Sequence, residues 1–520
     1  MLLIADWTSI YLNGFAAAAL ALLLWNALER RSEVAAFAPV VLLAGLLAMT
    51  SGLVLAQAEL QDKLFFFARD LLVQAVAAYI VRSLSQRPKY AVPALLILGV
   101  VYWLFYREVQ VETFRLATRP TKVADERAPG FRSYELLVYL PGGDSDLLAT
   151  PGVYAERAFE LTLEESPLSN YFAVDVESGN EAEVERLLSA LEASAVYAED
   201  NEQIHVEPVR NLPSGVSLVG PTPEVSGLDD PGVAQQWALS AWPYAAFAKT
   251  CREFAEDLRP TRLFVLDTGV DAEHPDLQKH YVSHEARSDR DVVGHGTHVA
   301  GIAAATANNG IGTAGWLPVG DADLSVSAIN VFTPMGYATQ RAVVQGIIDA
   351  ANAGASVINL SLGGISTDGK RRAYNDAVAY AAQRGTLVVA SAGNSATDAR
   401  RFAPANSDGV IVVGALDNAM RPADFSNSLD NVRLGVWAPG KDIYSLVPNG
   451  GYTLFSGTSM AAPQVSGLLT VAKAIDPSLD AESAYTLLQR TTGVAAQAGD
   501  SARPRAVRPA DFLREVARRR

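Results

Sequence analysis

The chain has 520 residues, 49% of them hydrophobic, and a formal net charge of −15 at pH 7. This length exceeds that of a typical single domain, so we expect more than one folded unit. Residues 1–106 hold seven Lys/Arg and six Asp/Glu, so the acidic excess lies in the remainder of the chain. An acidic globular part lacks the basic face that nucleic acid requires, which argues against nucleic-acid binding.

Four apolar segments near the N-terminus have about the length that a bilayer core demands. They cover residues 11–28, 34–56, 64–81 and 90–106. The third contains Arg69 and Asp70, so an interfacial amphipathic helix is the alternative to a span there. Basic residues follow the first apolar run instead of preceding it, which argues against a cleaved signal peptide. The sequence therefore predicts a transmembrane helical bundle in residues 1–110, embedded in the lipid bilayer.

Charges in the loops between these segments favour one orientation. Basic residues lie in the first and third loops: Arg30, Arg31, Arg82, Arg87 and Lys89. The positive-inside rule places both loops in the cytoplasm and the rest of the chain outside. Against this orientation, further basic residues follow the last segment: Arg107, Arg115, Arg119 and Lys122. We expect a multi-pass membrane protein with an extracytoplasmic globular part.

A linker and a small domain are expected after the apolar segments. Residues 111–130 are polar and contain proline, as is typical of a linker. Residues 131–210 show strand patterns at both ends and a helical pattern between them, which predicts an α+β domain. The alternative is a membrane-proximal spacer or a partner-binding module. Residues 211–230 are rich in Pro, Gly and Ser, so we expect a second, exposed linker that is open to cleavage.

The segment 231–515 alternates buried-strand patterns with helical patterns. We expect strands at 263–266, 357–360, 387–390 and 410–413. Helices are expected near 295–307, 342–353, 373–384 and 459–475. This alternation predicts an α/β domain with a mainly parallel sheet and helices on both faces. The single cysteine, Cys251, excludes an intrachain disulfide.

A serine in this segment has the setting of a nucleophile. Residues 457–463 read Gly-Thr-Ser-Met-Ala-Ala-Pro and continue into a run of small and apolar residues. Ser459 is therefore expected at the start of a buried helix, where unpaired N–H groups and the helix dipole favour a negative oxygen. The alternative is an ordinary Gly/Ser turn before a core helix.

A serine nucleophile needs a base, and the base needs a carboxylate that orients it. His295 lies between two glycines at the start of an Ala-rich helical pattern, which leaves one edge of its ring open to a partner. Asp267 ends the apolar run 263–266, as expected for a side chain at the carboxyl end of a buried parallel strand. Aspartic proteases also carry Asp-Thr-Gly, but they need two such triplets on β-rich lobes, and this chain has one.

A fourth segment offers a donor for an oxyanion. The strand pattern 387–390 leads into Ser-Ala-Gly and then Asn394. Removing such an amide from a tetrahedral oxygen costs about 3–4 kcal/mol. In isolation, Ala-Gly-Asn after a strand is more often a turn.

In the order Asp, His, Asn and Ser, these segments resemble the subtilisin-like serine proteases over about half of the chain. The resemblance implies a catalytic triad with an oxyanion donor, formed by Asp267, His295, Ser459 and Asn394. It implies that the segment 357–364 pairs with substrate backbone. It also implies a primary specificity pocket flanked by Ser361, Leu362, Gly363, Ala392 and Gly393. By order and position only, the domain at 131–210 looks like the propeptide of that family, which blocks the cleft.

Residues 308–313 resemble the calcium loop of that family. Asp276 resembles its carboxylate ligand, and Asn309 is the other side-chain candidate. A hard cation takes six or more oxygens, so backbone carbonyls would supply the rest of a structural calcium site. The alternative is an Asn-Gly turn beside a helix. The chemistry itself needs no cofactor.

The sequence thus predicts a membrane-anchored serine endopeptidase that acts on proteins or peptides and is inhibited by its own propeptide. One alternative is a catalytically silent protease fold that serves as a membrane receptor or scaffold. The four intact catalytic positions disfavour it. Another is a membrane transporter or sensor with an accessory globule, which the scarcity of charged residues in the spans disfavours.

Overall fold

The computed structural model describes a large part of the chain after residue 133. The described residues are 134–140, 148, 153–162, 166–176, 189, 191, 197–205, 227–318, 323–333, 336–366, 371–493 and 506–520. They belong to one compact unit, Tyr134–Arg520. No helix within them is long and apolar enough to cross a membrane. The apolar segments predicted to span the bilayer, and the linker after them, lie outside the described residues.

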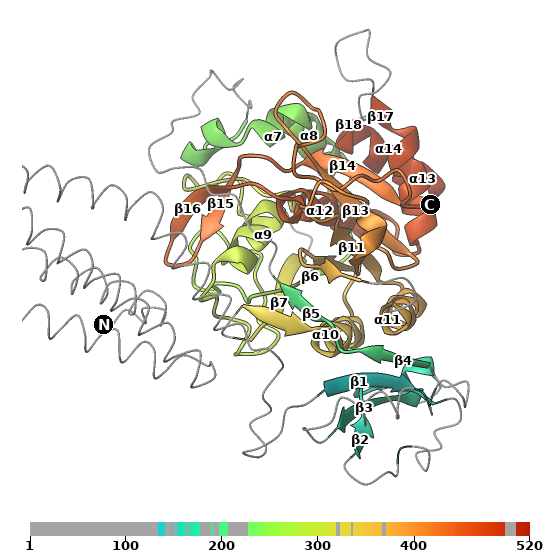
Figure 1. The fold of residues 1–520 in the computed structure, drawn as a ribbon. Helices are drawn as coiled ribbons and strands as arrows, with labels where there is room; N and C mark the ends of the chain where they lie inside the picture. The colour runs from blue at the N-terminus through green and yellow to red at the C-terminus, as the bar shows by residue number, and fades with distance from the viewer. Residues whose placement is uncertain are drawn as a thin grey trace, which may run out of the picture. The chain divides into compact units, whose positions relative to one another are not determined.

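A parallel sheet forms the centre of the larger domain (Figure 1). Its strand order, within the described residues, is β14-β13-β11-β9-β6-β7. Every pairing between these neighbours is parallel, as predicted. The strands are β6 (Thr261–Asp267), β7 (Leu324–Asn330), β9 (Val357–Leu360), β11 (Leu387–Ser391), β13 (Val410–Leu416) and β14 (Gly435–Pro439).

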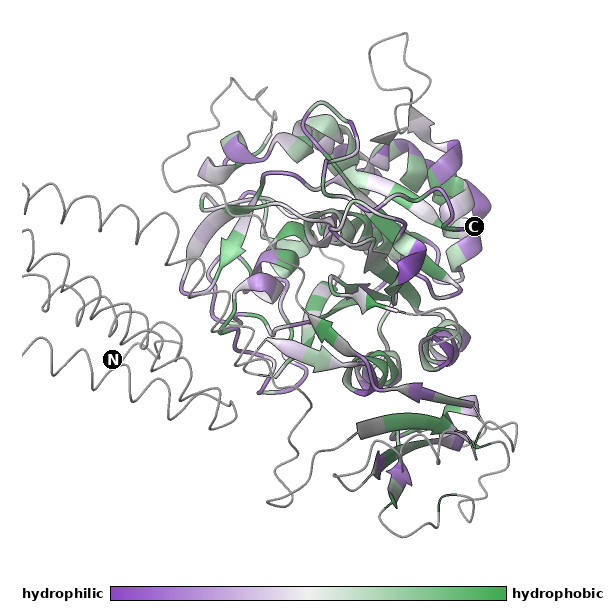
Figure 2. Cartoon of the chain, in the orientation of Figure 1, coloured by the Kyte–Doolittle hydropathy of each residue, from purple (hydrophilic) through white to green (hydrophobic). Residues whose placement is uncertain are grey.

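Helices cover both faces of this sheet. Alternate residues of each strand point to opposite sides and so pack into two separate hydrophobic cores. In β6, Leu263 and Val265 belong to one hydrophobic core, while Phe264 and Leu266 belong to the other. The first core includes side chains of α8 (Tyr244–Glu253), α9 (His295–Ala304), α12 (Thr458–Ile475), α13 (Ala481–Arg490) and α14 (Pro509–Arg519). The second includes side chains of α10 (Gln340–Asn352) and α11 (Arg372–Gln383). Figure 2 shows hydrophobic residues concentrated on the central sheet and on α12.

A second, antiparallel sheet precedes this domain, with strand order β2-β3-β1-β4. Its strands are β1 (Tyr134–Tyr139), β2 (Val153–Arg157), β3 (Tyr171–Val176) and β4 (Tyr197–Asp200). One face has its own small core with Leu136, Val138 and Val174. The other face contributes Leu137 and Tyr171 to the core that contains α10 and α11. The sheet therefore packs against these two helices (Figure 1).

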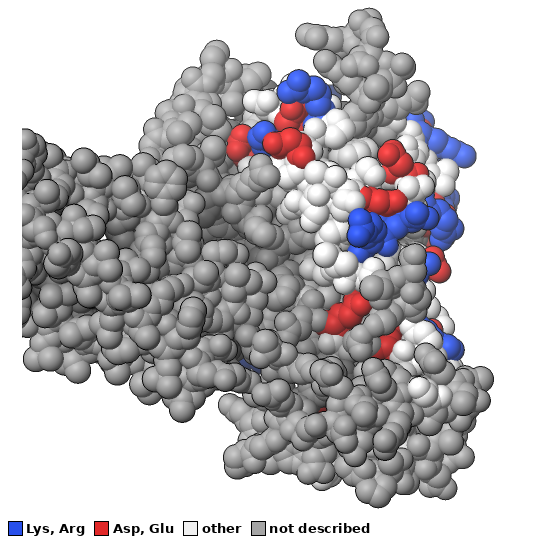
Figure 3. All heavy atoms as spheres, in the orientation of Figure 1, with Lys and Arg blue, Asp and Glu red and all other residues white. Residues whose placement is uncertain are grey.

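Short elements complete the described structure. The paired strands are β5 (Gln203–His205) with β8 (Tyr337–Thr339), β10 (Gly364–Ile365) with β12 (Phe402–Ala403), β15 (Ile443–Val447) with β16 (Gly451–Phe455), and β17 (Thr492–Gly493) with β18 (Ala506–Val507). The short helices are η3 (Pro167–Asn170), η4 (Pro231–Gln235), α7 (Trp237–Ala241), η5 (Ala255–Asp257) and η6 (Ala399–Arg401). On the face drawn in Figure 3, acidic and basic side chains both lie among the described residues, and several basic ones lie next to one another toward the right edge.

Candidate active site

A buried acid and a buried imidazole meet at the carboxyl edge of the sheet. Asp267 is the last residue of β6 and His295 is the first residue of α9. Asp267 Oδ1 lies 2.7 Å from His295 Nδ1, and the two side chains are 0% and 2% exposed. The same oxygen accepts a hydrogen bond from Thr268 N at 2.8 Å. A carboxylate in this position favours the tautomer that carries its proton on Nδ1 and stabilises the ring once it is protonated.

A second buried carboxylate, Asp291, fixes the turn that presents this histidine. It accepts hydrogen bonds from Gly294 N at 2.7 Å, from Thr297 N at 2.8 Å and from the Thr268 hydroxyl at 2.9 Å. Gly294 has φ of 92°, a conformation that favours glycine. Burial raises the pKa of the Asp291 carboxyl. The sequence analysis missed this residue because its role depends on contacts that only the fold creates.

Ser459 lies in the first turn of α12 and is 1% exposed. Its hydroxyl donates a hydrogen bond to Ser361 O at 3.3 Å. Helix α12 packs against α9, the helix that begins at His295. The serine and the histidine thus lie at the N-terminal ends of two helices that contact each other on one face of the sheet.

The side chain of Asn394 is held against the residues before this serine. Asn394 Oδ1 accepts hydrogen bonds from Thr458 N at 2.8 Å and from the Thr458 hydroxyl at 3.0 Å. The Thr458 hydroxyl accepts a hydrogen bond from Gly393 N at 3.1 Å. Since both bonds from Thr458 use the amide oxygen, Asn394 Nδ2 is left as a donor. A Cβ placed on Gly457 would lie 3.2 Å from that nitrogen, so the donor is close to the start of α12.

The segments predicted to flank a specificity pocket adjoin these groups through their backbone. Ser361 contacts Ser459 directly, and Gly393 contacts Thr458. Leu362 and Ala392 are 0% exposed and belong to the second core. Their side chains are therefore unavailable to a substrate. These segments can contact a substrate through their main chain, including that of the partly exposed Gly363.

An extended strand from the preceding domain lies beside this region. In β5, Ile204 is opposite Ala338 of β8, and His205 is opposite Tyr337. Strand β5 also contacts β10, which directly follows Gly363. Ile204 is 0% exposed. Strand β4 (Tyr197–Asp200) belongs to the antiparallel sheet, whereas β5 (Gln203–His205), the next strand along the chain, pairs with the larger domain.

A buried carboxylate joins β4 to the two helices below it. Glu199 is 1% exposed. It accepts hydrogen bonds from Tyr197 Oη at 2.7 Å, from Gln340 Nε2 at 3.2 Å and from Ala373 N at 3.2 Å. The last two donors lie in the first turns of α10 and α11, where helix dipoles favour negative charge. Burial raises the pKa of the Glu199 carboxyl.

Aromatic and charged side chains surround this contact. The Arg372 guanidinium lies 3.7 Å from the ring centroid of Tyr139 and 5.5 Å from that of Tyr197. Tyr171 donates a hydrogen bond to Asp376 Oδ2 at 2.8 Å. Because these bonds connect β1, β3 and β4 with α11, the small sheet is docked by specific polar contacts as well as by apolar packing.

The predicted calcium ligands come together and are joined by a second carboxylate. Asp276 accepts hydrogen bonds from Asn309 Nδ2 at 2.8 Å and from Thr313 N at 2.8 Å. Asp230, which the sequence analysis missed, accepts one from Asn309 N at 3.0 Å. Burial, with a contribution from the Asp230 charge, raises the pKa of Asp276 to about 6. These oxygens fit the preference of a hard cation. However, Asn309 directs its nitrogen at Asp276, so its amide would have to turn over to act as a ligand.

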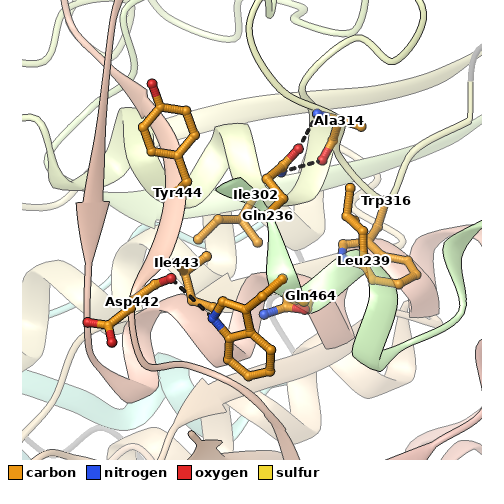
Figure 4. A pocket seen from close by; sticks show the side chains of 11 residues that line it. Gln236, Leu239, Ile302, Ala314, Trp316, Asp442, Ile443, Tyr444 and Gln464 are labelled. Carbon is orange, nitrogen blue, oxygen red and sulfur yellow. Dashed lines mark hydrogen bonds between the residues drawn. The ribbon is translucent and has the colours of Figure 1, made fainter. Parts of the chain in front are cut away.

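A metal site made of several ionisable ligands is absent from the described residues, since no three or more His, Cys, Asp or Glu side chains gather there. A small pocket lies elsewhere, next to Gln236, Trp316 and Gln464 (Figure 4). Its volume is about 10 Å³, enough for one water molecule. None of the candidate catalytic residues lines it, so this pocket is not the substrate site.

Comparisons with known proteins match this chain to one family of serine proteinases. The model of the Subtilase family matches residues 261–508. The thermophilic serine proteinase of Bacillus sp. (strain AK1) is 42% identical over 213 residues, which are 39% of this chain and 50% of that protein. Thermitase of Thermoactinomyces vulgaris is 41% identical over 213 residues, which are 40% of this chain and 72% of that protein. This chain thus spans half the length of the first relative and more than two thirds of the second.

A solved structure is similar over a larger part of the chain. It is fervidolysin from Fervidobacterium pennivorans, a keratinolytic enzyme related to subtilisin. The TM-score is 0.57 at 25% identity, and the match covers 75% of this chain and 62% of that one. Because residues 261–508 are less than half of this chain, the likeness extends beyond the family match.

Proposed function

This chain belongs to the subtilase family and is a subtilisin-like serine endopeptidase, and we propose that Asp267, His295 and Ser459 carry its chemistry. The observation that best supports this assignment is the buried 2.7 Å contact between Asp267 and His295. It lies at the start of a helix packed against the helix that begins beside Ser459. Subtilases need no cofactor for catalysis. The substrates we propose are proteins and peptides, whose backbone lies along the segment 361–364.

The reaction is acyl transfer to the serine. The Ser459 hydroxyl turns from Ser361 O to His295, which takes its proton as Oγ attacks the scissile carbonyl carbon. Asp267 stabilises the imidazolium ion. Asn394 Nδ2 and Ser459 N donate hydrogen bonds to the oxyanion. His295 gives the proton to the leaving amine, the C–N bond breaks, and water then releases the acyl group by the same steps in reverse order.

We also propose that the β1–β4 domain is an intramolecular inhibitor. The strand that follows this domain, β5, pairs with β8 and contacts β10, beside the segment proposed to hold substrate. A substrate strand and β5 would compete for this edge. Glu199 and the Arg372 contacts hold the domain on α10 and α11. Docking buries the Glu199 carboxyl, so loss of its proton at higher pH weakens the contact.

Membrane anchoring is the third part of the proposal. Its support is the set of four apolar segments before residue 107, each about as long as a bilayer core requires. Their loop charges favour an extracytoplasmic protease. Cleavage in the linker at 211–230 would release the protease from both the membrane and its inhibitor.

A comparison of wild-type protein with Ser459→Ala tests inhibition and anchoring together. Wild-type protein is expected to yield a shorter C-terminal fragment that leaves the membrane fraction, and peptidase activity should rise as this fragment accumulates. Ser459→Ala should stay full-length and membrane-bound, because it cannot cut its own linker. Size on a gel, carbonate-washed membrane fractions and N-terminal sequencing measure these outcomes. Two proteins of equal size that both remain in the membrane would contradict release, and recovery of Ser459→Ala in the soluble fraction would contradict anchoring.

We propose that Asp276, Asp230 and Asn309 bind a structural calcium ion after the Asn309 amide turns over. Calcium should then raise the melting temperature of the wild-type protein by a few degrees, since a ligand at a hundredfold excess over its Kd stabilises by about 2.7 kcal/mol. Asp276→Asn should abolish this shift. Magnesium is the control cation because it demands a tighter octahedral site. Differential scanning calorimetry measures these melting temperatures. An equal calcium-induced rise in wild type and Asp276→Asn would show that Asp276 does not bind the ion.

A further inference from the structure

A chain of buried polar groups lies beneath the proposed nucleophile. The Ser466 hydroxyl donates a hydrogen bond to Asn359 Oδ1 at 2.8 Å. Asn359 Nδ2 donates to the Ser361 hydroxyl at 2.9 Å. That hydroxyl donates to Ser459 O, also at 2.9 Å. Ser466, Asn359 and Ser361 are each 0% exposed, so no solvent replaces these bonds.

This chain compensates for a defect in helix α12. In a regular helix, the carbonyl of Ser459 would accept a hydrogen bond from the N–H four residues later. That residue is Pro463, which lies inside the helix and has no N–H. The Ser361 hydroxyl supplies the missing donor to this carbonyl. A buried carbonyl without a partner would be costly, and this bond both satisfies it and links the first turn of α12 to Ser361.

All three hydrogen bonds run in the same direction, from Ser466 through Asn359 and Ser361 to Ser459. Asn359 and Ser361 each donate a hydrogen bond and also accept one from the group before them, which strengthens the series cooperatively in a buried environment. Ser361 also contacts Ser459 a second time, since its carbonyl accepts the bond from the Ser459 hydroxyl at 3.3 Å. The carbonyl and the hydroxyl of Ser459 are thus both tied to Ser361.

We propose that Ser466, Asn359 and Ser361 are positioning residues that hold Ser459 in register for attack. This inference rests on the proposed function of Ser459. None of the three touches the reacting bond through its side chain. They act by fixing the first turn of α12 against β9 (Val357–Leu360), and therefore the distance and angle between the serine hydroxyl and its base.

Two hydroxyls of α12 provide a matched comparison. Ser466 and Thr470 are both 0% exposed and both donate to a carbonyl four residues earlier in the helix. Only Ser466 also lies within hydrogen-bond distance of Asn359 Oδ1, so its one proton is shared between that oxygen at 2.8 Å and Ala462 O at 3.1 Å. Loss of either hydroxyl removes a similar local bond, but loss of Ser466 alone interrupts the chain to Ser459. Ser466→Ala is therefore the test variant and Thr470→Val is its control.

The measurement is steady-state hydrolysis of a chromogenic peptide by the purified full-length protein, together with the melting temperature of each variant. Ser466→Ala is expected to lower kcat roughly tenfold and Ser361→Ala roughly a hundredfold, with KM little changed, because misplacement of a reacting group slows the chemical step. Thr470→Val should keep the wild-type kcat even where its melting temperature falls. The rate of covalent labelling of Ser459 by a fluorophosphonate should fall by the same factors as kcat.

Three outcomes would overturn the inference. They are wild-type kcat in Ser466→Ala, wild-type kcat in Ser361→Ala, or an equal loss of kcat in Ser466→Ala and Thr470→Val. If Ser459→Ala retains the peptide hydrolysis of the wild type, the proposed function is wrong, and the positioning role fails with it. If Ser361→Ala does not fold, the comparison of Ser466→Ala with its control Thr470→Val decides the question.

Discussion

Ser459→Ala is expected to abolish peptide hydrolysis, with kcat falling on the order of 10⁶-fold. That is the loss which removal of the nucleophilic serine causes in subtilisin, a member of the same family. The physical reason is that no other oxygen at this position can form the acyl intermediate. Binding and the oxyanion donors remain and leave a small residual acceleration over water. The check is hydrolysis of casein and of a chromogenic peptide by purified protein.

His295→Ala is the companion variant, because nucleophile and base act as a unit. Their single losses are expected to be similar, and the double variant should be scarcely worse than either one. Additive losses would mean that Ser459 and His295 work independently. A melting temperature equal to that of the wild type shows that Ser459→Ala removes chemistry and not the fold, since the small hydroxyl makes a single hydrogen bond to Ser361.

Asn394→Leu is expected to lower kcat by about 10²- to 10³-fold, a range that comes from removal of an oxyanion-hole asparagine in subtilisin. KM should change little, because the negative oxygen exists only in the transition state and the ground-state carbonyl gains little from the donor. The measurement is the separate determination of kcat and KM on one peptide.

The orientation of this amide provides a sharper version of the same experiment. Asn394→Asp keeps an oxygen that can accept the two hydrogen bonds from Thr458. It replaces the donor nitrogen by a second oxygen, so it should lose as much activity as Asn394→Leu while retaining more of the stability. A large rise in KM at wild-type kcat would instead assign Asn394 to ground-state binding.

Strands of the central sheet were predicted correctly where an apolar run is followed by a short polar or Gly-containing segment, as before Asp267 and Asn394. It missed β7 because Ser325 and Ser327 interrupt the apolar pattern, although both side chains are buried in the fold. Those hydroxyls are tolerated because the fold supplies partners that no local pattern reveals; Ser327, for example, donates to Val282 O.

In the candidate site, too, local sequence patterns identified some residues and missed others whose partners lie far away in the chain. Ser459, His295 and Asp267 stand in short motifs whose local setting is readable, so they were named from the sequence. Asp291 and Ser466 were not, because one carboxylate in a polar loop and one serine in a helix look ordinary until the chain folds. Their hydrogen bonds with Thr268 and Asn359 connect segments that no sequence pattern pairs. The predicted membrane spans lie outside the described residues and stay a prediction.

The most direct measurement of the central claim is site-mapped covalent labelling with a fluorophosphonate, which reacts only with a serine activated by a neighbouring base. Mass spectrometry of the labelled wild-type protein should find one adduct, on Ser459, and His295→Ala should label far more slowly. No adduct, an adduct on a different serine, or an unchanged labelling rate in His295→Ala would contradict the account.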